Sequence, residues 1–329
     1  MGTGIDQRPG RTRSTSGMPP PVHAARCFSL EGVTTNFAMP VILPVLPEPC
    51  STGVMDAVRD GRWVRQANHF TDRLGPPEPG RYRLYASYAC PWAQRVLIVR
   101  ELLGLQDLLD VAIVDPIRDE RGWRVPGGGF LSELYLATDP GFEGRHTVPC
   151  VWDVKERRIV TNDFPQITLD LETRWGGTPD LYPKELRDGI DAVNDRLYHG
   201  LNNAVYEAGF ARSQEAYEDA VGRVFATLDF LEERLTGSEF LFDRLTESDV
   251  RAYTTLARFD TVYYAHFKCS VRRLTDYPAV WAYARRLYAI PAFRETTDFD
   301  HIKRHYYMTQ TTINPNRLVP LGPELDWSL

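Results

Sequence analysis

The chain has 329 residues, of which 43% are hydrophobic and 25% charged. That length and composition predict an ordinary soluble protein with room for two domains. The formal net charge of −6, without a stripe of lysine or arginine, argues against nucleic acid or an anionic membrane surface as a partner. No apolar run approaches the length of a membrane span, since the best candidate is broken by Pro40, Pro44 and Pro47.

Residues 1–50 differ in composition from the rest of the chain. They are rich in glycine, proline, serine and threonine, and the first 30 carry four arginines against a single acid, Asp6. This composition predicts a disordered N-terminal extension. An arginine bias with few acids is also typical of an organelle transit peptide, which stays open as the alternative.

The cysteines are few and scattered: Cys27, Cys50, Cys90, Cys150 and Cys269, none of them in a C-x-x-C pair. An odd, widely spaced set argues against a disulfide framework and predicts a reducing, cytoplasmic location. Cys150 and Cys269 have apolar neighbours and are expected to be buried and inert.

The stretch "RLYASYACPWAQRVLIVRELLG", residues 83–104, predicts a strand that leads directly into a helix at a cysteine. Its left part alternates apolar and polar residues, which indicates a strand over Tyr82–Ser87. Its right part has the apolar spacing of a helix over Pro91–Leu103, opened by a proline and closed by Gly104. Cys90 is thereby predicted at the N-cap, where the helix dipole and the first amides favour a thiolate. We expect a nucleophile with a lowered pKa.

The order of the remaining elements predicts two domains. A second strand, "DVAIVD", completes a βαβ unit, and "TVPCVWDVKERRIVTND" predicts two further strands and a helix capped by Asn162 or Asp163. This thioredoxin-like α/β order is assigned to residues 51–175. Residues 176–329 have helical periodicity almost throughout, with a capping box at Thr246–Asp249, and predict an all-α domain with a C-terminal extension.

Several longer blocks, spread from about Arg62 to Pro323, carry a family resemblance: "SYACPWAQR", "TVPCVWD", "LNNAVYEAGFA", "RFDTVYYAHFKC" and "DFDHIKRHYY". On these blocks the chain resembles the glutathionyl-hydroquinone reductases, the Xi class of the glutathione transferases. The resemblance implies the glutathione transferase fold and a homodimer. It also implies a thiol-dependent reductase that cleaves S-glutathionyl-hydroquinones to hydroquinones through a mixed disulfide on Cys90, with glutathione as co-substrate.

The resemblance also implies roles for residues in both predicted domains. Tyr206 corresponds to the tyrosine proposed as proton donor, and Tyr263 and Tyr306 to two further tyrosines that face the cysteine. Trp123 corresponds to the tryptophan that packs on the bound thiol, and its polar, glycine- and proline-rich surroundings suit a partly exposed ring. The implied thiol-binding set is Trp123, Arg145, Thr147 and Val148, with Pro149 as a cis-proline, and with Asp163 and Phe164 after the "IV-N" block.

Three residues, at two places in the sequence, depart from the family pattern. Asp163-Phe164 stands where the family has Glu-Ser, a pair that holds the γ-glutamyl end of glutathione. The shorter acid and the added ring leave open another low-molecular-weight thiol, such as mycothiol, which lacks that group. Gln94 stands where the family has a histidine and is expected to be a minor change.

Two other functions stay open on the sequence alone. A general omega-like thiol transferase or dehydroascorbate reductase needs only Cys90, whereas the three tyrosines favour the reductase. A non-catalytic scaffold would be expected to have lost the cysteine. His301 and His305 have a spacing that could bind zinc, but no third ligand is evident and no metal is expected. The expected partners are small aryl thioethers or quinone adducts.

Overall fold

A four-stranded mixed sheet organises the first half of residues 57–329, the part of the chain that the computed structural model describes. The predicted extension over residues 1–50 lies outside the described residues. The strand order is β4-β3-β5-β6, with β3 and β4 parallel and the other pairs antiparallel. The strands are β3 (Tyr82–Ala86), β4 (Leu109–Ile113), β5 (Cys150–Asp153) and β6 (Arg158–Thr161). The predicted βαβ unit and the predicted strand pair after it are confirmed.

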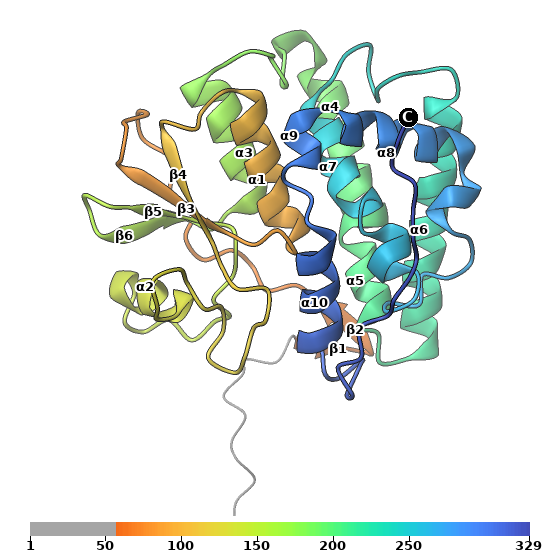
Figure 1. The fold of residues 1–329 in the computed structure, drawn as a ribbon, viewed down its shortest axis with the longest axis horizontal. Coiled ribbons are helices and arrows are strands. Elements are labelled where there is room, and N and C mark those ends of the chain that lie inside the picture. The colour runs from red at the N-terminus through yellow and green to blue at the C-terminus, as the bar shows by residue number, and fades with distance from the viewer. Residues whose placement is uncertain (1–56) are drawn as a thin grey trace, which may run out of the picture. The chain divides into compact units, whose positions relative to one another are not determined.

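Three helices cover this sheet. They are α1 (Pro91–Leu102), α2 (Leu131–Thr138) and α3 (Phe164–Asp170). Figure 1 shows α1 and α3 between the sheet and the helical half, with α2 on the other side of the sheet. Cys90 is the N-cap of α1 with a proline directly behind it, and Gly104 follows the helix with a φ of +68°. The predicted strand–cysteine–helix connection is therefore confirmed.

The second half of the described residues is helical, as the sequence predicts. Its helices are α4 (Arg187–Leu197), α5 (Ala204–Gly209), α6 (Gln214–Leu235), α7 (Glu247–Leu256), α8 (Pro278–Ala289), α9 (Pro291–Arg294) and α10 (Phe299–Thr309). Shorter 3-10 or π turns lie at Leu171–Trp175, Lys184–Leu186, Tyr198–Asn202, Phe259–Tyr263 and Leu274–Asp276. The capping box between Thr246 and Asp249 opens α7 as predicted.

A short hairpin precedes the sheet and packs on the helical half. It consists of β1 (Ala57–Arg59) and β2 (Arg62–Val64). The backbone N–H of Arg212 donates to the Gly61 carbonyl at 2.8 Å, next to the start of α6. Residues 57–64 therefore contact the helical half, although the sequence assigns them to the α/β domain. The chain then crosses from this hairpin to the sheet through residues 65–70.

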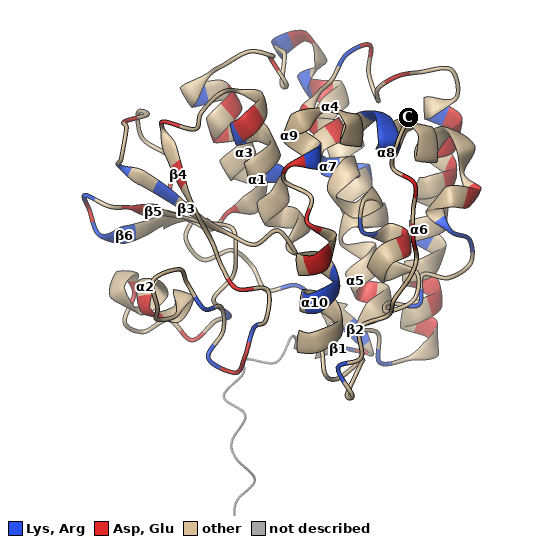
Figure 2. Ribbon diagram, in the orientation of Figure 1, with Lys and Arg blue, Asp and Glu red and all other residues tan. Residues whose placement is uncertain are grey.

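Charged residues of both signs are spread over the described part of the chain. Figure 2 shows acidic and basic residues interspersed along the helices and loops, with no single basic face along a helix. Within residues 57–329, no helix is long and apolar enough to cross a bilayer.

A buried carboxylate at the start of α7 joins helices from both halves. The fully buried Glu247 accepts hydrogen bonds from Thr168 Oγ1 on α3 at 2.8 Å and from Asn194 Nδ2 on α4 at 2.7 Å. Arg251 Nε, one turn further along α7, donates to the same carboxylate at 2.6 Å. Because these partners fill its lone pairs, the burial of this charge is compensated.

Replacing Glu247 by alanine should destabilise the protein strongly. The change leaves Arg251 almost buried without its anion, so the free energy of unfolding should fall by about 3–5 kcal/mol. Glu185→Ala is the matched control, since it breaks an exposed ion pair with Arg244 at 3.4 Å and should cost less than about 1 kcal/mol. Urea denaturation at neutral pH measures both. Similar losses for the two variants would contradict the role of Glu247.

Candidate active site

Cys90 lies on a turn that is held from the helical half. Arg258, just past the end of α7, is fully buried. Its Nη2 donates to the Tyr88 carbonyl at 2.7 Å, and its Nε donates to the Ala89 carbonyl at 3.0 Å. These bonds fix the two residues before the cysteine. The helical half therefore helps to set the position of the thiol.

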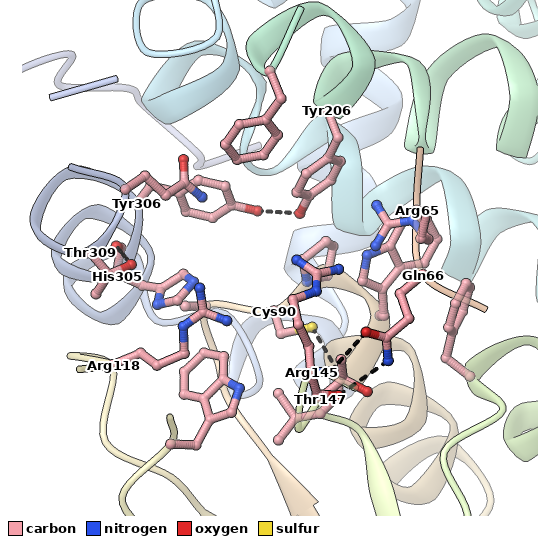
Figure 3. Close-up of a pocket in the computed structure, with 18 of the residues that line it drawn as sticks. Arg65, Gln66, Cys90, Arg118, Arg145, Thr147, Tyr206, His305, Tyr306 and Thr309 are labelled. Atoms are coloured by element: carbon pink, nitrogen blue, oxygen red, sulfur yellow. Dashed lines mark hydrogen bonds between the residues drawn. The ribbon is translucent and has the colours of Figure 1, made fainter. Parts of the chain in front are cut away.

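The thiol opens into a cavity of about 290 Å³ that both halves line. Figure 3 shows Cys90 below the Tyr206–Tyr306 pair, with His305 and Arg118 on one side and Arg65 and Gln66 on the other. Seven of the residues predicted from the sequence share this wall with the cysteine: Trp123, Arg145, Thr147, Val148, Phe164, Tyr206 and Tyr306. The structure thus brings together residues that are more than 200 positions apart in the chain.

The three predicted tyrosines form one hydrogen-bonded cluster. The hydroxyl oxygens of Tyr206 and Tyr306 are 2.5 Å apart, and that of Tyr263 lies 3.0 Å from Tyr306 and 3.4 Å from Tyr206. Tyr206 and Tyr306 line the cavity, whereas the ring of Tyr263 is fully buried behind them. The expectation that Tyr263 faces the cysteine is therefore wrong, because only its hydroxyl connects it to the site. Burial raises the pKa of all three phenols, so they keep their protons at neutral pH.

The electrostatics of Cys90 differ from the prediction. Burial raises the pKa of the thiol, although the Ala93 amide and the guanidinium groups of Arg258 and Arg65 act in the opposite direction. The thiol also donates to the Val148 carbonyl at 3.4 Å, which stabilises the protonated form. The predicted lowering of the pKa is therefore wrong for the protein in this structure. The N-cap effect is present, but desolvation by the two halves outweighs it.

Trp123 lies on the cavity wall but is only 4% exposed. Its ring stacks on the imidazole of His305, with centroids 4.8 Å apart and an interplanar angle of 19°. The prediction of a partly exposed ring is wrong, because α10 covers one face of it. That contact joins a loop of the sheet half to a helix near the end of the chain, so local composition could not indicate it.

Side chains from elsewhere anchor the predicted thiol-binding segment, residues 145–149. Gln66 Oε1 accepts from the backbone N–H of Arg145 at 2.7 Å. The hydroxyl of Tyr135 donates to the Thr147 carbonyl at 2.8 Å. The peptide bond between Val148 and Pro149 is cis, as predicted.

Asp163 and Phe164, the pair that departs from the family pattern, lie at the start of α3. Asp163 is the N-cap and Phe164 is the first residue of the helix. Asn68 Nδ2 donates to Asp163 Oδ1 at 2.9 Å, and burial raises the pKa of this carboxyl. The ring of Phe164 packs on that of Trp92, with centroids 4.4 Å apart. Asp163 and Phe164 line a second cavity of about 450 Å³, which shares Asn68 and Phe164 with the first. The pair is therefore placed to contact a ligand that extends beyond Cys90.

Arg65 is a site residue that the sequence did not indicate. Its guanidinium lies over three aromatic rings, 4.8 Å from the centroid of Trp63, 4.6 Å from Trp92 and 4.9 Å from Tyr206. Its Nε donates to Asn203 Oδ1 at 2.7 Å. Trp63 is two residues away, but Trp92 and Tyr206 are distant in sequence, and residues 65–70 carry no motif, so only the tertiary structure identifies this arginine.

Gln94 is hydrogen-bonded to residues of the helical half. Its Oε1 accepts from Arg258 Nη1 at 2.5 Å, and its Nε2 donates to Thr297 Oγ1 at 2.8 Å. Gln94 therefore takes part in holding the turn before Cys90, and the expectation that its replacement of the family's histidine is minor stays a prediction. With the carbonyls of Tyr88, Ala89 and Thr254, Gln94 supplies one of the four oxygens that hold the buried guanidinium.

The two histidines of α10 have different surroundings. The Nε2 of His301 lies 3.7 Å from Asp298 Oδ2, and its ring meets the ring of Tyr88 edge-on at 5.7 Å. The Nδ1 of His305 lies 2.8 Å from the Pro116 carbonyl oxygen. Among residues 57–329, the structure has no group of three or more His, Cys, Asp or Glu side chains placed to hold a metal ion. Cys150 and Cys269 are buried, as predicted.

Family models and individual known proteins indicate the same family for this chain. The model of the glutathione S-transferase N-terminal domain matches residues 89–174, and that of the C-terminal domain matches residues 214–286. The glutathionyl-hydroquinone reductase PcpF of Sphingobium chlorophenolicum is 43% identical over 282 residues, covering 80% of this chain and 90% of that protein. The glutathionyl-hydroquinone reductase YqjG of Escherichia coli is 41% identical over 296 residues, covering 81% and 90%.

Solved structures of proteins from the same family superpose on this chain. The Xi glutathione transferase of Phanerochaete chrysosporium superposes with a TM-score of 0.78 at 42% identity, covering 82% of this chain and 95% of that one. The glutathione-bound structure of Escherichia coli YqjG superposes with a TM-score of 0.73 at 42% identity, covering 76% and 87%.

Replacing Arg65 by an uncharged residue should raise the pKa of Cys90. The alkylation rate of the wild-type protein with iodoacetamide should have its midpoint at or above the ordinary thiol value of about 8.5. In Arg65→Gln the midpoint should move higher, because a nearby positive charge favours the thiolate and its loss disfavours it. Arg62→Gln, in the preceding hairpin and paired with Asp219 in solvent, should leave the midpoint unchanged. A wild-type midpoint well below 8.5, or a downward shift in Arg65→Gln, would contradict this account.

Proposed function

Because this chain belongs to the Xi class of the glutathione transferases, the family of the glutathionyl-hydroquinone reductases, we propose that it is a thiol-dependent reductase of hydroquinone thioethers. In this proposal Cys90 attacks the sulfur of an S-conjugated hydroquinone and forms a mixed disulfide with the thiol. The hydroquinone leaves, and a second thiol molecule releases Cys90. A two-step route through a covalent intermediate is typical of a cysteine nucleophile.

The observation that carries the proposal is the meeting of one thiol and two phenol hydroxyls in one cavity. A carbon leaving group is poor unless it gains a proton, so cleavage of an aryl thioether requires a placed acid. Exchange between thiols and disulfides requires none, because a thiolate leaves unprotonated. The Tyr206–Tyr306 pair therefore favours the thioether reductase over a general thiol transferase.

Within the tyrosine cluster, Tyr206 is best suited to donate the proton. It lines the cavity, and burial raises its pKa, so it is a phenol at neutral pH. Hydrogen bonds from Tyr263 and Tyr306 lower the pKa of Tyr206 and so oppose the effect of burial, because both hydroxyls can donate to the Tyr206 phenolate. The arrangement thus supplies a proton donor and stabilises what remains after the transfer.

Glutathione is the thiol that family membership favours, and the E. coli relative is described with glutathione bound. The ring of Phe164 stands where the family has a serine that contacts the γ-glutamyl end, and it packs on Trp92 at 4.4 Å. A thiol without that group, such as mycothiol, is the alternative. We propose further that the enzyme acts in the cytoplasm and as a homodimer, as in the family it belongs to.

Intact-mass measurement should identify the thiol and the nucleophile together. The measurement uses a protein in which Cys27 and Cys50 are replaced by serine, so that Cys90 and two buried cysteines are left. After incubation with glutathione disulfide or mycothiol disulfide, this protein should gain the mass of one thiol, and dithiothreitol should remove it. In the same background, Cys90→Ser should gain none and should lose all turnover of S-glutathionyl-hydroquinone. Cys269→Ser, a change at a buried thiol, is the matched control and should behave like wild type. A stable adduct in Cys90→Ser would exclude Cys90 as the nucleophile.

Tyr206→Phe should separate the two candidate activities. Loss of the acid should slow reduction of S-glutathionyl-hydroquinone by about a hundredfold or more. Reduction of a small mixed disulfide should change little, because its leaving thiolate needs no proton. The measured quantity is the ratio of the two rates. Equal losses on both substrates would refute Tyr206 as a dedicated acid, and wild-type activity on disulfides alone would favour the general thiol transferase.

A further inference from the structure

His305, in the last turns of α10, lies on the cavity wall in a fixed orientation. Its Nδ1 is 2.8 Å from the Pro116 carbonyl oxygen. A carbonyl oxygen only accepts, so Nδ1 carries a hydrogen and donates it. The stacking of the ring on Trp123, at 4.8 Å and 19°, fixes the plane of the imidazole.

The second nitrogen of this ring is an acceptor. Burial lowers the pKa of His305 to about 3, and the guanidinium groups of Arg118 and Arg258 and the ring of His266 add to the lowering. Only the bond to Pro116 acts in the opposite direction. The imidazole is therefore neutral at physiological pH, and with Nδ1 protonated, Nε2 bears the lone pair.

The cavity thus offers a proton acceptor and a proton donor on different walls. His305 and Arg118 lie on one side of Cys90, and the hydroxyl pair of Tyr206 and Tyr306 lies above it (Figure 3). An aromatic ring placed between them can lose a proton from a hydroxyl group while it gains one on carbon. That exchange converts a hydroquinone into its keto tautomer, in which the carbon–sulfur bond adjoins a carbonyl group.

We propose that His305 is a catalytic base of this enzyme, whose Nε2 removes the proton from the ring hydroxyl beside the thioether carbon. The inference rests on the proposed function, because it concerns the hydroquinone part of the same substrate. The support for this role is the place of the ring on the cavity wall and its single tautomer. The lowered pKa keeps Nε2 free of a proton but also weakens it as a base, so the proton that it takes returns readily to the ring oxygen when the carbon–sulfur bond breaks.

The proton and electron balance closes without a further reagent. First, Nε2 takes the hydroxyl proton, a carbonyl group forms, and the sulfur-bearing carbon takes a proton from Tyr206. Then the Tyr206 phenolate takes the proton of the Cys90 thiol, the resulting thiolate attacks the sulfur, the S–S bond forms and the C–S bond breaks. The released electron pair reaches the oxygen, which regains its proton from His305. The ring carbon is reduced, the two sulfurs are oxidised to a disulfide, and the incoming thiol, which releases Cys90 from that disulfide, passes its proton to the Cys90 sulfur.

The test compares two thioethers that differ in their need for this base. S-glutathionyl-hydroquinone must tautomerise before cleavage, whereas S-phenacylglutathione already has a carbonyl group beside its carbon–sulfur bond. If glutathione is not the thiol retained at Cys90, the corresponding mycothiol adducts are used. His305→Gln, which can still donate to a carbonyl, and His305→Phe, which keeps a stacking ring, should each lower the rate on the hydroquinone thioether by about a hundredfold. The loss on the phenacyl thioether should be at least tenfold smaller.

His301→Gln, one turn earlier on α10, is the matched control and should leave the ratio of the two rates at the wild-type value. Equal losses on both thioethers in the His305 variants would assign His305 a structural role and overturn the proposal, as would no loss on either. If the wild-type enzyme cleaves neither thioether but reduces disulfides, the proposed function itself fails. That failure is seen without any variant and is thus distinguished from a failure of His305 alone.

Discussion

The active site depends on one buried guanidinium. Arg258 donates to the carbonyls of Tyr88 and Ala89, to Gln94 Oε1 and to the Thr254 carbonyl, the last at 2.6 Å. These acceptors belong to the loop before Cys90, the helix after it and α7, which ends just before the arginine. One side chain thus orients the nucleophile, ties the two halves together and places a positive charge close to the sulfur. The bonds also satisfy the buried donors, which makes the burial of the charge tolerable.

The chemistry is divided between the two halves. The sheet half contributes the thiol and the segment expected to hold the thiol ligand, and the helical half contributes the phenols and the imidazole. Within residues 57–329, Cys90 lies in one half and the phenols of the cavity lie in the other, so the reaction that we propose requires the relative placement of the two halves to be fixed. The network around Glu247 on α7 serves that placement, since it bonds α3 to α4 and α7.

The sequence predicts a feature correctly when the feature depends on residues that are close together in the chain, and less well when it depends on distant contacts. The strand–Cys90–helix connection and the capping box at Thr246–Asp249 depend on residues within a few positions of one another, and both are correct. Arg65 was not foreseen because two of its three ring partners, Trp92 and Tyr206, come from distant segments. The direction of the Cys90 pKa shift and the burial of Trp123 were predicted wrongly, because each is a sum over tertiary contacts. Tyr206 and Tyr306 were found through family resemblance, since nothing in their local sequence distinguishes them from packing residues.

The neutral surroundings of Arg258 also bear on the redox chemistry of the site. The four oxygens that accept hydrogen bonds from Arg258 are uncharged. When Cys90 is a thiolate, its sulfur therefore supplies the negative charge that these hydrogen-bond partners lack. Conversion of the thiolate to a disulfide removes that charge again. A cation that stabilises the reduced form raises the reduction potential of the cysteine couple, by about 30 mV for each tenfold change in the equilibrium constant. In electrochemical terms, the residue that orients the nucleophile also makes its mixed disulfide a stronger oxidant towards the incoming thiol, which favours return of the enzyme to its active form.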